Sequence, residues 1–434
     1  MATQSIISRD TDSLGRVESF EVESRDAEIT LDSKTLRRRG LMVVLAGFMA
    51  NFTVFGIGFS YGVFQEYYMS GDGPLHDKST SIVSLIGTIG TALTYLGGIL
   101  HSPLDRVLSP RNQMLTGSII LSLGLILTGS CSKVYQFMLC QGILFGIGSS
   151  MAYLPPVVCG PPYFTKHRGI AMGAVFSGTG FGGLVMAPLA RALISAMGFR
   201  WALRTLGFMS LVLTGTASFL VFPHPSQTVA SHGLVNLRIA RSSKFILQCV
   251  GSLSQAAAYI VPLFYMSSYG ETLGYSSSQG AVFIGVNNAV NAISKIVFGY
   301  FADVVGRINM LVFCCIMSTA SVFGLWYVPA QSTFVAFVIL YGVFSGPIIA
   351  LLPACLVELF GVQNYQSMSG FMYFTRGVGN LLGSPIAGLF VTKGSSPMNY
   401  RGAIIYTGAM LLANSVAFAI LRGFVGYEQR KLKA

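Results

Sequence analysis

The feature that most constrains this chain is a series of long apolar runs between residues 41 and 424. An α-helix rises about 1.5 Å per residue, so about 20 apolar residues cross the hydrocarbon core of a bilayer. The chain is 52% apolar and only 10% charged, and a soluble domain of this composition would expose too much apolar surface to water. The sequence therefore predicts an all-α membrane protein with twelve transmembrane helices.

The predicted spans fall into two groups of six around a polar connector. The first group lies at 41–64, 80–100, 112–130, 134–158, 169–190 and 201–222. The second group lies at 244–268, 279–301, 309–328, 332–357, 369–391 and 401–424. We therefore expect an N-terminal half at 41–222, a cytosolic connector at 223–243 and a C-terminal half at 244–424. The flanking segments 1–40 and 425–434 are expected to be cytosolic tails, and the first is expected to be disordered because it is polar and mixed in charge.

An internal repeat supports the division into halves. Three residues of the first half recur in the second at an offset of 196: Phe164, Met172 and Gly183 match Phe360, Met368 and Gly379. Pro188 matches Pro385 at 197, and Asp105 matches Asp303 at 198. Recurrence at an offset near 197 favours duplication of a six-helix unit.

Positive charge near the span ends predicts the orientation. The side that holds both termini carries sixteen Lys and Arg residues, against five on the other side. Cytoplasmic loops retain positive charge during insertion, so both termini are expected in the cytosol, with the plasma membrane as the expected location. The net charge of +12 is assigned to lipid headgroups and not to nucleic acid, because no basic stripe interleaved with aromatics occurs.

No pattern of residues suggests covalent chemistry. The seven cysteines lie almost entirely in apolar runs, and the five histidines are scattered without metal-ligand spacing. A membrane-bound enzyme would need a nucleophile, metal cluster or cofactor motif, so no catalysis, metal or cofactor is expected. A receptor or sensor that binds without transport stays open as the alternative to a carrier.

Two cations inside the predicted spans mark the candidate binding site. An ionised side chain at membrane depth costs about 2.5 to 3.5 kcal/mol, so Lys295 and Arg376 should meet a cavity or a partner. Asn287 and Asn291 precede Lys295 at four-residue spacing and predict one polar stripe, and Asn380 follows Arg376 by four. Without a matching carboxylate, the two cations predict an electropositive pocket for an organic anion. The alternatives are that Lys295 extends to the headgroups and that Arg376 bonds carbonyls at a helix break.

Several segments resemble known transporter motifs. The stretch 163–173, leading to Gly178 and Gly182, resembles the signature that enters span five of the monocarboxylate transporters, a family of major facilitator carriers. The run 51–64 resembles the first span of that family. The resemblance is strongest to divergent fungal-type members, which include organic-acid carriers and metabolite efflux proteins. It implies two six-helix halves that move a carboxylate-bearing small molecule by alternating access, functional as a monomer.

The resemblance also implies site residues and departures from the family pattern. Asn291 and Lys295 stand where the family carries an aspartate and an arginine, and Phe59 stands where it carries a lysine. Asn51 begins the matching run of the first span and joins the candidate substrate site. Since neither Asn291 nor Phe59 titrates, we expect anion recognition without the usual lactate and proton mechanism, and proton coupling stays open.

The loop charges resemble a degraded major facilitator motif. Asp105 with Arg106 and Arg111 is similar to that motif, and Asp303 with Arg307 is its counterpart. The resemblance implies that these loop charges pair across the cytosolic side when the carrier opens outward. The expected gate comprises Asp105, Arg106, Arg111, Asp303, Arg307, Lys166 and Arg168. Retention of positive charge in cytosolic loops explains the arginines nearly as well.

Overall fold

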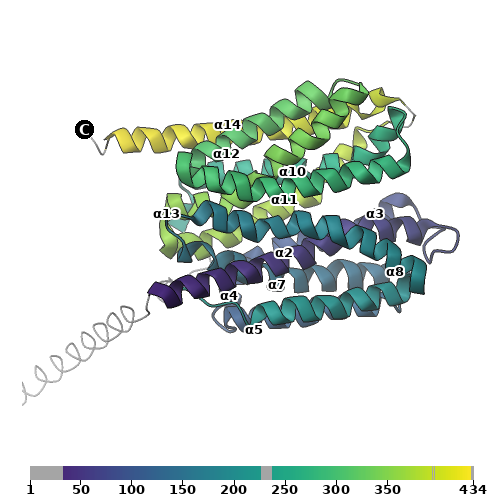
Figure 1. Cartoon of the computed structure of the whole chain (residues 1–434), viewed down its shortest axis with the longest axis horizontal. Coiled ribbons are helices and arrows are strands. Elements are labelled where there is room, and N and C mark those ends of the chain that lie inside the picture. Colours follow the sequence, from purple (N-terminus) through teal and green to yellow (C-terminus); the bar gives the residue numbers. More distant parts are fainter. Residues whose placement is uncertain (1–32, 226–236, 393, 395, 432–434) are drawn as a thin grey trace, which may run out of the picture.

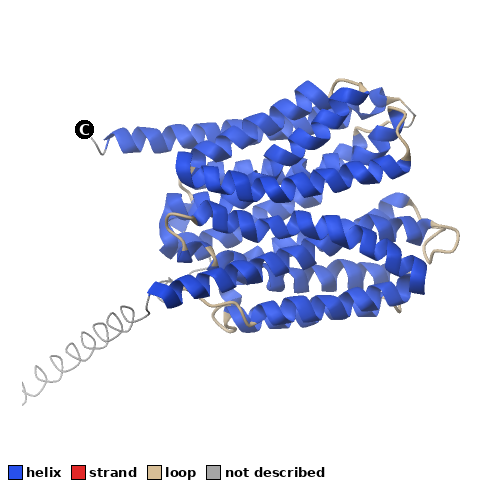
Figure 2. Cartoon of the chain, in the orientation of Figure 1, coloured by secondary structure: helices blue, strands red, loops and turns tan. Residues whose placement is uncertain are grey.

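The computed structural model describes residues 33–225, 237–392, 394 and 396–431, and every regular element in them is helical (Figure 2). The first elements are α2 (Ser33–Met69), α3 (Thr80–Leu96), α4 (Gly98–Leu104), α5 (Pro110–Thr128), α6 (Val134–Phe137), η1 (Met138–Leu144), α7 (Phe145–Cys159), η2 (Pro161–Tyr163) and α8 (Arg168–Ser218). After the connector follow α9 (Leu237–Ala240), α10 (Ser243–Thr272), α11 (Ser277–Val305), α12 (Arg307–Ser321), η4 (Val322–Trp326), α13 (Gln331–Leu389), η5 (Pro397–Tyr400) and α14 (Arg401–Lys431).

These elements provide twelve spans. In the described part of the chain, nine helical segments are long and apolar enough to cross a membrane. Two of them, α8 and α13, each contain two spans, because Gly198 (φ 75°, ψ 161°) and Gly361 (φ 76°, ψ 164°) interrupt the helical backbone. A positive φ favours glycine, which lacks the Cβ that clashes there. With α5, whose 19 residues begin with a polar first turn, the total reaches twelve, so the predicted fold class is confirmed.

The helices extend beyond several predicted boundaries. α2 begins at Ser33, so the expectation of a disordered tail is wrong for 33–40, and residues 1–32 lie outside the described part. α14 continues to Lys431 and replaces most of the predicted tail at 425–434. The connector contains the short helix α9, while 226–236 lie outside the described residues. Lys, Arg and Leu have high helix propensity, so helices can continue past the apolar run into water.

The helices run side by side along the long axis of the molecule (Figure 1). α2 to α8 gather in one bundle and α10 to α14 in a second, which we call the first and second bundles. α2 begins and α14 ends at the same end of the molecule, at the left of Figure 1, which we call the termini face. Apolar side chains cover the outside: Ile119, Leu123 and Leu127 of α5 recur every four residues and are 45 to 48% exposed. Such a stripe suits contact with lipid tails.

The two bundles approach each other closely at two helix crossings. At the first, α8 packs on α11, and a Cβ on Gly299 would lie 2.5 Å from the carbonyl oxygen of Gly169. At the second, α13 packs on α3 and α4, and a Cβ on Gly370 would lie 2.6 Å from the carbonyl oxygen of Gly98. Glycine therefore permits backbone contact between the bundles at both crossings.

Candidate functional site

Lys295 is fully buried at the contact between the two bundles. It lies on α11, and its Nζ donates a 2.5 Å hydrogen bond to Oγ1 of Thr179 on α8. The Thr179 hydroxyl in turn donates to the carbonyl of Phe176 at 2.9 Å. Lys295 forms no ion pair with any carboxylate in the described part of the chain. The alternative in which this side chain extends to the headgroups is therefore wrong.

The polar residues before Lys295 contact different neighbours. Asn287 donates to the carbonyl of Val338 on α13 at 2.7 Å. Asn291 donates to the hydroxyl of Tyr259 on α10 at 3.4 Å. Both contacts lie within the second bundle, whereas Lys295 reaches the first. The expected single stripe is thus split. Each step of four residues turns an α-helix about 40° beyond one full circle, so Asn287 and Lys295, eight residues apart, point in directions that differ by about 80°.

Arg376 is buried on the part of α13 that follows Gly361. Its Nη1 donates to Oε1 of Gln255 on α10 at 2.8 Å, and its guanidinium carbon lies 5.5 Å from the ring centre of Tyr95. Its Nε has no hydrogen-bond partner among the described residues. Arg376 thus bonds the Gln255 side chain and packs on the Tyr95 ring. The alternative, in which Arg376 bonds backbone carbonyls at a helix break, is wrong.

Aromatic rings from both bundles surround Arg376. The ring centres of Tyr95, Tyr153 and Tyr373 lie 5.8 to 6.3 Å from one another. Phe55 of α2 lies 5.1 Å from Tyr153 and 5.3 Å from Tyr95. Tyr259, the partner of Asn291, lies one turn of α10 beyond Gln255, the partner of Arg376. Asn291 and Arg376 therefore belong to one cluster of cation, amide and phenol groups.

The remaining predicted site residues, Asn51, Phe59 and Asn380, lie on α2 and α13. Asn51 donates to the Gly47 carbonyl of its own helix and packs beside Gly178, the residue before Thr179. The ring of Phe59 lies 6.1 Å from that of Phe55. Asn380 is buried, one turn beyond Arg376 on α13. Sequence reasoning missed Thr179, Tyr153, Gln255 and Tyr259, since neutral residues in apolar runs carry no signal of depth or direction.

At the termini face, Asp303 of the second bundle holds the first turn of α8. Its Oδ1 accepts from the backbone N–H of Gly169 at 2.8 Å, and its Oδ2 from that of Ile170 at 3.0 Å. The first amides of a helix have no partner within the helix and carry partial positive charge, so a carboxylate fits there. Arg307 pairs with Asp303 at 3.0 Å and donates to the carbonyl of Thr165 at 2.7 Å.

Asp105 makes the corresponding contact from the first bundle. Its Oδ2 accepts from Nε2 of Gln366 on α13 and lies 3.4 Å from Nε2 of His101. Its buried Oδ1 has no partner among the described residues. The expected pairing of one loop charge with another across this face is therefore wrong. Asp105 accepts from the Gln366 amide, and Asp303 accepts from backbone amides of the first bundle. The arginine that pairs with Asp303 belongs to the same bundle as Asp303.

Two further predicted gate residues, Arg168 and Arg111, contact groups of their own bundle. Arg168 is buried and donates to the carbonyl of Pro161 at 2.9 Å. The guanidinium of Arg111 lies 4.3 Å from the ring centre of Phe219. Lys166 and Arg106 are exposed. Among the predicted gate residues, Asp105, Asp303 and Arg307 form hydrogen bonds from one bundle to the other.

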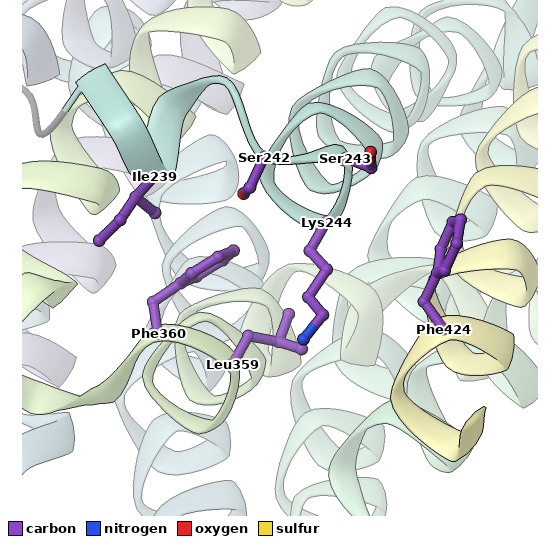
Figure 3. A pocket seen from close by; sticks show the side chains of 7 residues that line it. All are labelled: Ile239, Ser242, Ser243, Lys244, Leu359, Phe360 and Phe424. Atoms are coloured by element: carbon purple, nitrogen blue, oxygen red, sulfur yellow. The ribbon is translucent and has the colours of Figure 1, made fainter. Parts of the chain in front are cut away.

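A separate cavity of about 430 Å³ lies where α9, α10, α13 and α14 meet (Figure 3). Its lining consists of Ile239, Ser242, Ser243, Lys244, Leu359, Phe360 and Phe424. None of the predicted substrate residues is among them. No group of three His, Cys, Asp or Glu residues in the described ranges is placed to hold a metal ion.

Comparison with known proteins identifies the family. Residues 40–341 and 289–433 match the family described as the Major Facilitator Superfamily. The chain is 29% identical to an MFS-type transporter, pynF, of Aspergillus niger, over 92% of this chain and 91% of that protein. It is 28% identical to the agnestins efflux protein AgnL12 of Paecilomyces divaricatus, over 88% and 87%.

Solved structures agree in fold. The transporter FucP in the outward conformation superposes with a TM-score of 0.70 at 12% identity, over 87% of this chain and 98% of that one. The helices, the two glycine-mediated crossings and these relatives lead to one conclusion. The chain belongs to the Major Facilitator Superfamily and is a multi-pass integral membrane transporter of a small molecule.

Proposed function

We propose that this transporter moves an organic anion by alternating access, with Lys295 and Arg376 as the cations that attract it. The observation that carries the proposal is the environment of Lys295: fully buried between the bundles, bonded to a hydroxyl and paired with no carboxylate among the described residues. A buried ammonium without a counter-ion carries a desolvation cost of several kcal/mol. A negatively charged substrate that binds beside it would offset this cost.

The residues around the second cation favour a substrate that is more than a small carboxylate. Arg376 lies among Tyr95, Tyr153 and Tyr373, which combine apolar ring surface with hydroxyl groups. An acid with a conjugated or aromatic body would stack on these rings while its charged end meets a cation.

The bond between Lys295 and Thr179 provides a physical link between occupancy and conformation. It joins α11 of one bundle to α8 of the other, so it exists only while these helices are in contact. A substrate carboxylate would compete with Thr179 for the ammonium. A ligand shifts a conformational equilibrium only by its difference in affinity for the two states, and this competition supplies such a difference.

The direction of transport is proposed to be efflux across the plasma membrane, with both termini in the cytosol. The agnestins efflux protein, 28% identical over most of both chains, supports this direction by analogy. The excess of positive charge on the termini side supports the orientation. The chain is further proposed to belong to the monocarboxylate porter branch of the superfamily and to work as a monomer, coupled to a proton gradient.

Transport assays in reconstituted vesicles test the proposal. Untargeted comparison of metabolites inside and outside cells with and without the protein first supplies candidate anions, and counterflow of the labelled compound then measures exchange. Lys295→Ala should lower the initial rate at least about tenfold, equivalent to about 1.4 kcal/mol, and Lys295→Arg should restore part of it. Lys133→Ala, which removes an exposed lysine at the other end of the molecule, is the matched control. Parent-level anion transport by Lys295→Ala would contradict the assignment.

A further inference from the structure

Asp105 sits in a buried polar cluster that also contains a histidine. His101 ends the second span and is only 2% exposed. Its Nδ1 lies 2.9 Å from Nε2 of Gln113 on α5, and its Nε2 lies 3.4 Å from Oδ2 of Asp105. Gln366 donates to the same Asp105 oxygen from the second bundle. The cluster therefore joins three helices and spans the contact between the bundles.

The hydrogen-bond pattern of the cluster is incomplete in a specific way. Two buried acceptors, Oε1 of Gln113 and Oδ1 of Asp105, have no donor among the described residues. With the Gln113 amide nitrogen directed at Nδ1, that ring nitrogen must act as an acceptor, so the hydrogen of neutral His101 lies on Nε2, toward Asp105. Two acceptors of the cluster thus lack a hydrogen, and one added proton would supply one of them.

We propose that His101 and Asp105 form the binding site for a proton that is coupled to transport. The proton adds to Nδ1 of His101, and a half-turn of the Gln113 amide presents the unpaired Oε1 to the new N–H group. The bond from the Gln113 amide nitrogen to Nδ1 is exchanged for this new bond, and the net charge of the pair changes from −1 to zero. The role of this proton in coupling rests on the proposed function, whereas its binding does not.

The burial of Asp105 makes its negative charge costly, which favours neutralisation of the pair by a proton. Burial raises the pKa of its carboxyl above the ordinary range, and His101 and Gln366 oppose that shift only in part. Cys159 of α7 also interacts electrostatically with Asp105, and the exposed Arg106 follows Asp105 in the chain. Asp303, by contrast, has the guanidinium of Arg307 at 3.0 Å.

Proton binding is expected to loosen the termini face. Gln366 lies in the second turn of the helix that begins after Gly361, and a negative charge near a helix N-terminus stabilises the contact. Once the His101 and Asp105 pair is neutral, this attraction weakens and Asp105 turns toward the imidazolium. The contact with the second bundle should therefore open more readily as the pH falls.

A distance measurement tests the site without a known substrate. Spin labels at Val107→Cys and Gln363→Cys, both exposed and on opposite sides of the contact, report the opening in lipid nanodiscs. The native cysteines in the described residues are buried or half-buried and should react slowly. We expect the short-distance population to fall at least threefold between pH 8 and pH 5. A parent protein whose distances do not change over this range would overturn the proposal.

Variants identify the groups that respond. His101→Asn and Asp105→Asn should abolish the pH dependence, while Asp303→Asn should raise the open population at every pH without removing the dependence. Gln113→Leu, which removes the acceptor for the added hydrogen, should lower the midpoint by about one pH unit and serves if His101→Asn does not fold. An unchanged pH response in His101→Asn, or an unchanged midpoint in Gln113→Leu, would count against the site. Absence of anion counterflow alongside an intact pH response would reject the proposed function and leave the proton site standing.

Discussion

The two aspartates of the termini face occupy matched positions in the two halves but meet different partners. Asp303 receives two backbone N–H groups of α8 and the guanidinium of Arg307. Asp105, 198 residues earlier, receives one side-chain amide and a distant imidazole. The residues at the same offset explain the difference. Gly299 corresponds to His101, and Arg307 corresponds to Ser109, which caps α5 instead of pairing with the aspartate.

This comparison teaches how a duplicated contact can acquire two roles. The corner around Asp303 has a permanent cation within 3.0 Å, so its charge is compensated at any physiological pH. The partners of Asp105 in the described residues include the Gln366 amide and the His101 imidazole, which are neutral or titratable, so the charge of this corner can change. One corner therefore acts as a fixed attachment between the bundles, and the other is free to respond to protons.

The largest effect is expected from Asp303→Asn. The substitution removes the negative charge that stabilises the N-terminus of α8. The asparagine amide has one acceptor oxygen, so it accepts fewer of the three hydrogen bonds from the two backbone N–H groups and Arg307 than the carboxylate does. The closed termini face should lose about 2 to 3 kcal/mol, measured as a shift in the short-distance population. Asp72→Asn, in an exposed loop at the other end of the molecule, is the control. A population equal to that of the parent would mean that Asp303 is not a fixed attachment.

A smaller loss is expected from Arg307→Ala. Asp303 would keep both backbone hydrogen bonds, while the ion pair and the bond to the Thr165 carbonyl would disappear. We expect about 1 kcal/mol, with Arg307→Lys between the variant and the parent because lysine lacks the planar fork. The same distance measurement checks this order. A loss greater than that of Asp303→Asn would show that the arginine, and not the aspartate, holds the corner.

Asp105→Asn should alter the pH dependence of stability more than stability itself. Burial raises the pKa of Asp105, so the folded protein binds a proton more readily than the unfolded chain. The parent should therefore become more stable as the pH falls from the raised pKa toward the ordinary value of about 3.9, and this gain is lost as the pH rises again. Thermal unfolding from pH 7 to pH 4 should show a smaller gain in the variant. Superimposable profiles would remove Asp105 from the titrating cluster.

The smallest effect is expected from Ser109→Arg, which copies the arginine of the second corner into the first. A cation four residues after Asp105 would compensate its charge, although the cap of α5 would be lost. We expect the two effects on stability to offset each other within about 1 kcal/mol, and the midpoint of the pH-dependent opening to fall by about one unit. Ser109→Ala separates loss of the cap from gain of the charge. An unaltered midpoint would show that the missing arginine does not explain the difference between the corners.

Sequence patterns were sufficient to place the spans and the buried cations. Lys295 and Arg376 stood out because charge is rare in apolar runs, and both are buried in the structure. The spacing of Asn287, Asn291 and Lys295 predicted one shared face, but these side chains contact two different bundles. Spacing along one helix predicts the direction of each side chain relative to the axis of that helix. It does not predict which neighbouring helix lies in that direction. The unpaired Oδ1 of Asp105 was likewise invisible, since it depends on groups 4 to 261 residues away.

The sequence by itself determined the helical membrane fold, the number of spans and the duplicated aspartates, because the bilayer requires long apolar helices and because repeats survive in linear order. Only the tertiary structure decided that Thr179 would bond Lys295, that α8 would begin against Asp303, and that His101 would be buried beside Asp105. These contacts join residues far apart in the chain. They depend on how closely glycine lets the two bundles approach, which no local pattern encodes.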